Sequence, residues 1–168
     1  MSDLNAGVEA LTATLAEEER IYTSLLALAG FEERAIDDGD VSELTDLTEQ
    51  KEQLLEVVAT LETERMTALV AIAAATDLET DALTLSRVIE AAEPEQGAAL
   101  TEVGVLVRAR AVALKQANER NAALLRSRSD VVERWIDFLR KVVSGSLTYT
   151  AEGSPQEPDG SRVLDQSA

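Results

Sequence analysis

The chain has 168 residues and a net charge of −17, and it contains neither cysteine nor histidine. These absences exclude disulfides, thiolate chemistry and the usual general base and metal ligand, and the negative charge argues against nucleic acid or an anionic membrane as the main partner. Hydrophobic residues make up 45% of the chain but aromatic residues only 3%, which is typical of long, coiled-coil-like helices rather than sheets.

The first predicted helix runs from about Asp3 to Asp37. Apolar residues at alternating steps of three and four form a stripe, and Glu18 and Glu32 interrupt it. Carboxylates at such positions indicate partly solvated places along the seam rather than an active site. The stripe comprises Leu4, Val8, Leu11, Leu15, Tyr22, Leu25, Ala29 and Ile36.

The sequence Asp38-Gly39-Asp40 predicts a tight turn after this helix. Glycine suits the left-handed conformation that ends a helix, and Asp40 with Glu43 forms a capping box for the next one. The acidic turn lacks the alternating ligands of a calcium-binding loop, so a metal site is not expected. A connection this short predicts two antiparallel helices.

The second predicted helix covers about Val41 to Ala75. Lys51 and Arg65 occupy stripe positions, where their aliphatic stems can cover apolar surface while the charges reach solvent. A short helix is expected at about Thr84–Ala92, with Thr84 as its N-cap. The stripe of the second helix comprises Leu44, Leu47, Leu54, Val58, Leu61, Ala68, Ile72 and Ala75.

A third long helix is predicted from Pro94 to Ser144, with proline in its first turn, where a missing N–H has no cost. It holds the only tryptophan and nine of the fifteen basic residues. Residues 1–76 carry 17 acids and 4 bases, whereas residues 100–142 carry 5 acids and 9 bases. We therefore expect the acidic hairpin to pack against the basic helix, with charge setting the register and apolar burial holding it.

The last turns of this helix are the candidate partner-binding surface. At about 1.5 Å per residue, the helix is long enough to extend past the hairpin from around Asp130. The alternatives are that this segment folds back on its own bundle or pairs with a second copy. The candidate binding residues are Val131, Val132, Trp135, Phe138, Leu139 and Val142.

The composition changes after Gly145. Residues 146–168 are rich in glycine, proline and serine, which predicts a flexible tail after a single helical-bundle domain of residues 1–145. The longest apolar run, Met66–Ala75, is about half the roughly 20 residues of a membrane helix, so no membrane insertion is expected. The start of the chain lacks the pattern of a signal peptide.

Four segments in order resemble the FlgN family of flagellar export chaperones. They are LTDLTEQKEQLLEVVATLETER in the second helix, TLSRVIEAAEPE in the connector, QANERNAALL in the long helix and LTYTAEG in the tail. Asn118 and Asn121 match the paired asparagines of that family, and Tyr149 with Gly153 matches its Tyr-x-x-x-Gly tail signature. The resemblance covers nearly the whole chain.

The predicted elements form an all-α, elongated antiparallel helical bundle, for which no cofactor is expected. The resemblance implies that it acts as a cytoplasmic chaperone of flagellar type III secretion, without catalysis. It implies FlgK and FlgL as cargo, bound through their amphipathic terminal helices, and FlhA as the export gate. It also implies that Tyr149 and Gly153 dock at the gate. Asn118 and Asn121 are expected to be structural, with direct contact to the cargo as the alternative. The alternative is a coiled-coil scaffold protein that self-associates through the long helix, for example as a homodimer.

Overall fold

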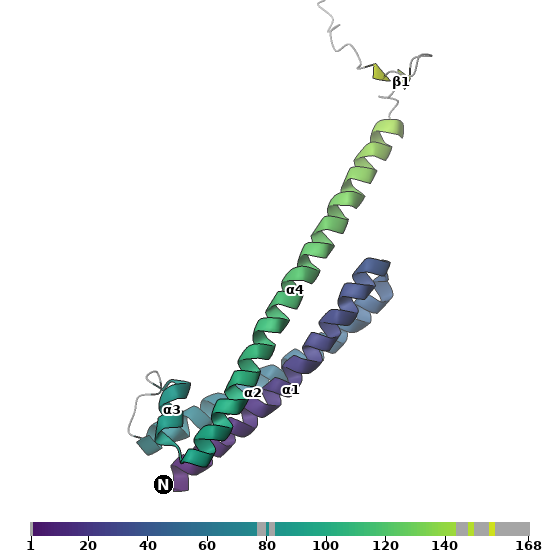
Figure 1. Ribbon diagram of the computed structural model, residues 1–168. Coiled ribbons are helices and arrows are strands. Elements are labelled where there is room, and N and C mark those ends of the chain that lie inside the picture. Colours follow the sequence, from purple (N-terminus) through teal and green to yellow (C-terminus); the bar gives the residue numbers. More distant parts are fainter. Residues whose placement is uncertain (1, 77–79, 81–82, 144–147, 150–154, 157–168) are drawn as a thin grey trace, which may run out of the picture. The chain divides into compact units, whose positions relative to one another are not determined.

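The computed structural model describes residues 2–76, 80, 83–143, 148–149 and 155–156. Four helices occupy most of this part of the chain: α1 (Ser2–Asp38), α2 (Val41–Thr76), α3 (Leu85–Ala91) and α4 (Pro94–Val143). Figure 1 shows α1 and α2 as an antiparallel hairpin and α3 beside the first turns of α4. The all-α prediction is confirmed, and the helix ends lie within about one residue of those expected.

The turn between α1 and α2 has the predicted chemistry. Gly39 adopts a φ of 72°, its N–H donates to the Ile36 carbonyl at 3.2 Å, and the N–H of Asp40 donates to the Ala35 carbonyl at 2.9 Å. These bonds satisfy carbonyls at the end of α1 that have no partner within the helix. The Asp40 carboxylate then accepts the N–H of Glu43 at 2.9 Å, which caps α2.

The connector also follows the prediction. The Thr84 hydroxyl accepts the N–H of Arg87 at 3.3 Å and so caps α3, and α4 starts directly at Pro94. The two helices approach closely at Gly97, where an added Cβ would lie 3.2 Å from the Ile89 carbonyl oxygen. A glycine at this position therefore lets α3 turn back onto the start of α4.

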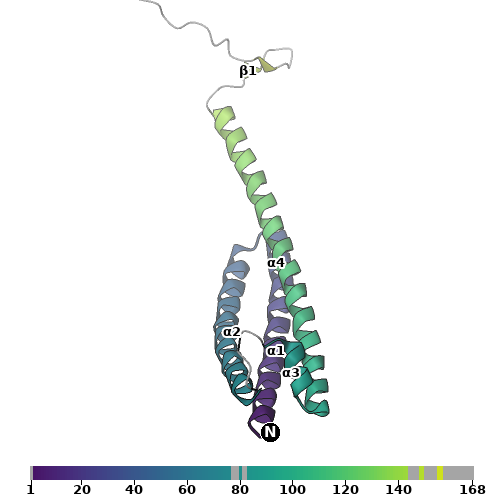
Figure 2. The same ribbon diagram turned by 90° about the vertical axis from the view of Figure 1, so that its left-hand side faces the viewer.

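Helix α4 runs alongside α1 in the same direction up to residue 124. The Gln96 side chain donates to the Asn5 carbonyl at 3.3 Å, and the Asn121 side chain donates to the Ala29 carbonyl at 2.8 Å. The sequence separation is 91 residues for the first bond and 92 for the second, so the register changes by only one residue between them. In Figure 2, α1 lies between α2 and this part of α4.

The main core lies at the end of the bundle where α1 begins and α2 ends. It draws on all four helices and consists of Val8, Leu11, Leu15, Ala68, Ile72, Val88, Leu100 and Val103. Each large apolar side chain that is fully buried there contributes about 1.5–3 kcal/mol. Gly7 allows α1 and α2 to approach, because a Cβ at this residue would lie only 2.9 Å from Cγ1 of Ile72.

Packing divides the chain into two units, residues 1–124 and residues 125–168. In the second unit, β1 (Thr148–Tyr149) pairs in antiparallel fashion with β2 (Pro155–Gln156). The other residues of the predicted flexible tail, 146–168, lie outside the described part of the chain. The predicted domain boundary at residue 145 stays a prediction. Of the helices described, none is long and apolar enough to cross a membrane.

Candidate partner-binding surface

The predicted binding residues on α4 expose their apolar side chains. Trp135 is 60% exposed and Leu139 is 52% exposed, and Ile136 beside them is 42% exposed. Val142 also belongs to α4, but its side chain lies outside the described part. We call the exposed set the α4 apolar stripe, and it comprises Val131, Val132, Trp135, Phe138 and Leu139.

The two aromatic residues of the stripe pack against each other. Trp135 and Phe138 are one helical turn apart, and their rings meet edge to face, with centroids 5.8 Å apart and an interplanar angle of 89°. This is a favourable geometry for two aromatic rings. With Arg134 they line a shallow hollow of about 270 Å³. The pair therefore presents a preformed apolar feature to a partner.

The spacing of the stripe suits one amphipathic partner helix. Residues 131, 135, 138 and 142 recur at steps of three and four, which places them on one face of α4. Basic residues Arg140 and Lys141 lie in the last turn of the helix, where they complement its negative end. Contiguous apolar side chains left in water are typical of a protein-binding site.

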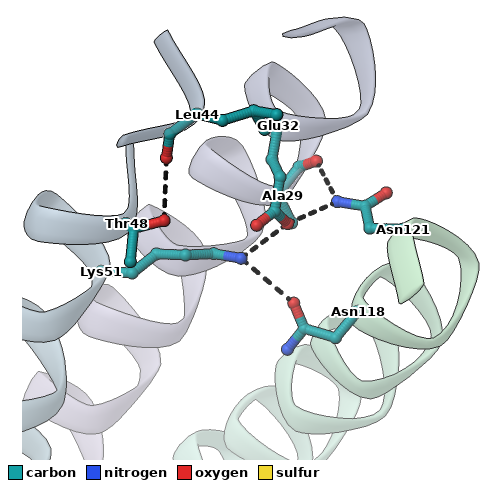
Figure 3. Close-up of polar contacts among 7 residues, drawn as sticks. All are labelled: Ala29, Glu32, Leu44, Thr48, Lys51, Asn118 and Asn121. Carbon is teal, nitrogen blue, oxygen red and sulfur yellow. Dashed lines mark hydrogen bonds and ion pairs between the residues drawn. The ribbon is translucent and has the colours of Figure 1, made fainter. Parts of the chain in front are cut away.

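The two family-motif asparagines bond within the bundle (Figure 3). Asn121 is buried, and its Nδ2 donates to the Ala29 carbonyl at 2.8 Å and to Glu32 Oε2 at 2.7 Å. Asn118 accepts a long bond of 3.5 Å from Lys51 Nζ. The two acceptors around Nδ2 fix the orientation of the Asn121 amide. Its other atom, Oδ1, is buried and has no hydrogen-bonding partner within the described residues.

Glu32 joins this cluster to α2. Its Oε2 accepts from Lys51 Nζ at 2.7 Å, and both side chains are mostly buried, with 17% and 18% of their surfaces exposed. The Lys51 charge is therefore less accessible to solvent than the sequence predicts, because a largely buried carboxylate across the hairpin holds it. We call Glu32, Lys51, Asn118 and Asn121 the polar cluster; it connects α1, α2 and α4.

Glu18 also differs from its predicted partly solvated position. It is only 2% exposed, and Arg65 Nη1 lies 4.0 Å from its Oε1. Burial raises the pKa of the Glu18 carboxyl above its usual range, Arg65 lowers it in part, and Glu62 adds to the increase. Burial in a low-dielectric seam disfavours the charged form.

The two ion pairs between α1 and α2 could have been predicted from the sequence. Glu32–Lys51 and Glu18–Arg65 are centred on the same point of the hairpin, just after Asp40. Each pair places opposite charges at stripe positions that face each other when the helices fold back. Taken one residue at a time, the four charges indicated solvated seam positions; taken as pairs, they indicate the register of the hairpin.

The expected complementarity between the acidic hairpin and the basic helix has a specific instance at Arg110. Its Nε donates to Glu19 Oε1 at 2.9 Å. Hydrogen bonds from Arg110 and from Thr23 hold the pKa of Glu19 below its usual range. Other long-helix bases pair within α4 instead, as in Lys115 with Glu119 at 3.9 Å and Arg140 with Asp137 at 3.3 Å.

The predicted gate-docking residues lie largely beyond the described side chains. Tyr149 belongs to β1, where its backbone pairs with Pro155. Gly153 lies outside the described residues. Their role in gate docking stays a prediction. Within the described residues, no group of three or more acidic side chains could hold a metal ion.

Comparison with protein-family models gives a match that spans almost the whole chain. The model described as FlgN protein matches residues 1–157. Comparisons with curated proteins and with solved structures give no significant match. The matched range includes the hairpin, the connector, all of α4 and the Tyr149 motif. The chain therefore belongs to the FlgN family of flagellar export chaperones.

Proposed function

We propose that this chain is a cytoplasmic chaperone of flagellar type III secretion that binds the terminal helices of FlgK and FlgL and delivers them to FlhA. Membership of the FlgN family supports the flagellar role. The observation that carries the cargo-binding proposal is the α4 apolar stripe, whose large side chains are about half exposed or more. Such a surface fits an amphipathic helix in the helix-in-groove mode.

In this proposal, the chaperone covers the apolar face that the cargo helix later uses in assembly. Trp135 and Phe138 act as the central anchors, because large aromatic side chains dominate the energy of small interfaces. Val131, Leu139 and Val142 extend the contact along one face of α4. While its apolar face is covered in this way, the cargo cannot assemble prematurely.

The test is calorimetric titration of C-terminal FlgK and FlgL peptides into the full chain and into the Trp135→Ala/Phe138→Ala variant. We expect the double variant to lose detectable binding, since each hot-spot truncation costs about 2 kcal/mol or more. The matched control is Val105→Ala/Val112→Ala, which removes exposed apolar groups from α4 within residues 1–124 and leaves the stripe intact. The control should bind both peptides as the original chain does.

Equal affinity of the original chain and the Trp135→Ala/Phe138→Ala variant for both peptides contradicts the proposed cargo surface. Sedimentation velocity separates it from the scaffold alternative. A chaperone binds one cargo tail per chain, whereas a scaffold self-associates through the stripe, and the double substitution then converts the oligomer to a monomer.

The proposed gate contact is Tyr149, together with Gly153, and rests on the family tail signature. Tyr149→Ala should weaken capture of the cytoplasmic domain of FlhA and leave cargo-peptide affinity unchanged. Tyr149→Phe removes the hydroxyl and keeps the ring, so it tests which of the two groups is needed to capture FlhA. Equal capture of FlhA by Tyr149→Ala and by the original chain overturns this assignment.

A further inference from the structure

A second apolar cavity lies within residues 1–124, apart from the α4 apolar stripe. Its volume is about 270 Å³, and residues of α1, α2, α3 and α4 line it, together with Leu83 before α3. Ligand pockets for whole small molecules usually exceed about 300 Å³, so this one has room for one or two side chains. Its apolar wall comprises Leu11, Leu15, Leu69, Leu83, Val88 and Val107.

The charged residues that line this cavity are both arginines, Arg65 and Arg108. Arg65 is held by Glu62, 2.5 Å from Nη2, and by Glu18, 4.0 Å from Nη1. Its Nε is buried and has no hydrogen-bonding partner within the described part of the chain. Arg108 is exposed, and within the described residues no ion pair involves it. The cavity therefore combines an apolar floor with one exposed cation, Arg108, at its edge.

Leu85 gives the cavity its shape. Its Cδ2 packs against α4 at Gly104, where an added Cβ would lie only 2.7 Å away. Leu85 is nevertheless 41% exposed, so it forms a wall of the cavity that a partner can reach. A glycine on α4 thus lets this leucine lie close to the helix and leaves the space over Val107 open.

We propose that this cavity docks an acidic segment of a partner protein, with a leucine- or phenylalanine-sized side chain in the cavity and a neighbouring carboxylate on Arg108. The size fits an apolar side chain, and Arg108, which takes part in no ion pair within the described residues, fits the carboxylate. The net charge of −17 repels an acidic partner at long range, but salt screens this repulsion beyond about 10 Å. The contact with Arg108 acts at close range and therefore selects the docking position. This inference does not depend on the proposed function.

The test uses three synthetic peptides with blocked ends: ELFDE, its basic counterpart KLFKK, and EAADE, which lacks the apolar side chains. Each is titrated into the full chain while the methyl resonances of Leu83, Leu85 and Val88 are followed by NMR. We expect only ELFDE to shift these resonances in a saturable way. Arg108→Glu should weaken its binding by about tenfold or more. Arg120→Glu, another exposed base on α4, should leave the binding unchanged.

The Trp135→Ala/Phe138→Ala variant separates this cavity from the cargo surface. Unchanged ELFDE binding in that variant supports the cavity, and lost binding there overturns it. The proposal also fails if Arg108→Glu binds ELFDE as tightly as the original chain, or if KLFKK and EAADE shift the same resonances. Decanoate is the control for a small amphiphile: saturable shifts with decanoate and none with ELFDE contradict docking of a protein segment.

Discussion

Asn121 on α4 and Glu32 on α1 are joined by a hydrogen bond of 2.7 Å from Nδ2 to Oε2. The same carboxylate oxygen accepts Lys51 Nζ of α2, also at 2.7 Å. One atom thus connects three helices at a point far along the hairpin from the main core. Apolar contacts would still form if α4 slid along α1 by one helical turn. The hydrogen bonds that Lys51 and Asn121 donate in the polar cluster form in one register only. It therefore fixes the position of α4 along α1 within residues 1–124.

The first prediction concerns Glu32. Glu32→Ala leaves the Lys51 ammonium and the Asn121 amide without their shared acceptor. Both donors are partly buried, so water can replace the lost hydrogen bonds only in part. We therefore expect the free energy of unfolding to fall by about 1–3 kcal/mol. Urea denaturation followed by circular dichroism measures this difference.

The matched control for Glu32→Ala is Glu49→Ala, an exposed acid on α2. It changes the net charge equally and should alter the free energy of unfolding by less than about 0.5 kcal/mol. Equal effects of the two substitutions would mean that overall charge, rather than the polar cluster, accounts for the result.

The second prediction is a pH dependence that arises at Glu18. Because burial raises the pKa of this carboxyl in the folded chain, folding favours its protonated form. The contribution of protonated Glu18 to the free energy of unfolding is complete below the ordinary pKa of Glu. This contribution is lost as the pH rises through the raised pKa of the folded chain. Arg65 offsets this loss only in part, while Glu62 adds to it.

Glu18→Gln removes the titration and keeps the shape of the side chain. The free energy of unfolding of this variant, minus that of the original chain, should increase as the pH rises from about 4 to about 7. Chemical denaturation at several pH values gives the difference. A flat difference for Glu18→Gln would contradict the prediction.

The third prediction compares two glycines on the hairpin. Gly39 has a φ of 72°, a conformation that costs other residues about 1–2 kcal/mol, so Gly39→Ala should destabilise the fold. Gly30 lies inside α1 with open space around it, and Gly30→Ala should stabilise the fold by about 0.5–1 kcal/mol. Thermal unfolding should show a lower melting temperature for Gly39→Ala and a higher one for Gly30→Ala. A change of the same sign in both variants would contradict this prediction.

The sequence predicted the helices because their signals are local. Stripe periodicity located α1, α2 and α4, and Gly39, Asp40 and Thr84 predicted the ends that the structure shows. Each of these signals acts within one or two turns of the chain, so no knowledge of the packing was needed. The start of α4 at Pro94 was predictable for the same reason, because proline favours the first turn of a helix.

The contact of Asn121 with the hairpin and the second cavity depend on distant segments of the chain, and the sequence did not reveal them. Glu32 meets Asn121 only when α4 adopts one register along α1, and a stripe of leucines and alanines permits several. The cavity arises from the position of Leu85 over Gly104. Glu18 is buried against the prediction, and Lys51 is less exposed than predicted, for the same reason: burial of a charge depends on its partner across the hairpin.

The fourth prediction separates residues that hold the fold from those proposed to bind a partner. Ile72 is fully buried in the main core, so Ile72→Ala should lower the free energy of unfolding by about 2–5 kcal/mol. Trp135 is 60% exposed, and Trp135→Ala should change it by less than about 0.5 kcal/mol, although the side chain removed is larger. Urea denaturation of the free chain tests both. A large loss of stability in Trp135→Ala would mean that the α4 apolar stripe is covered in the free protein and is not available as a binding surface.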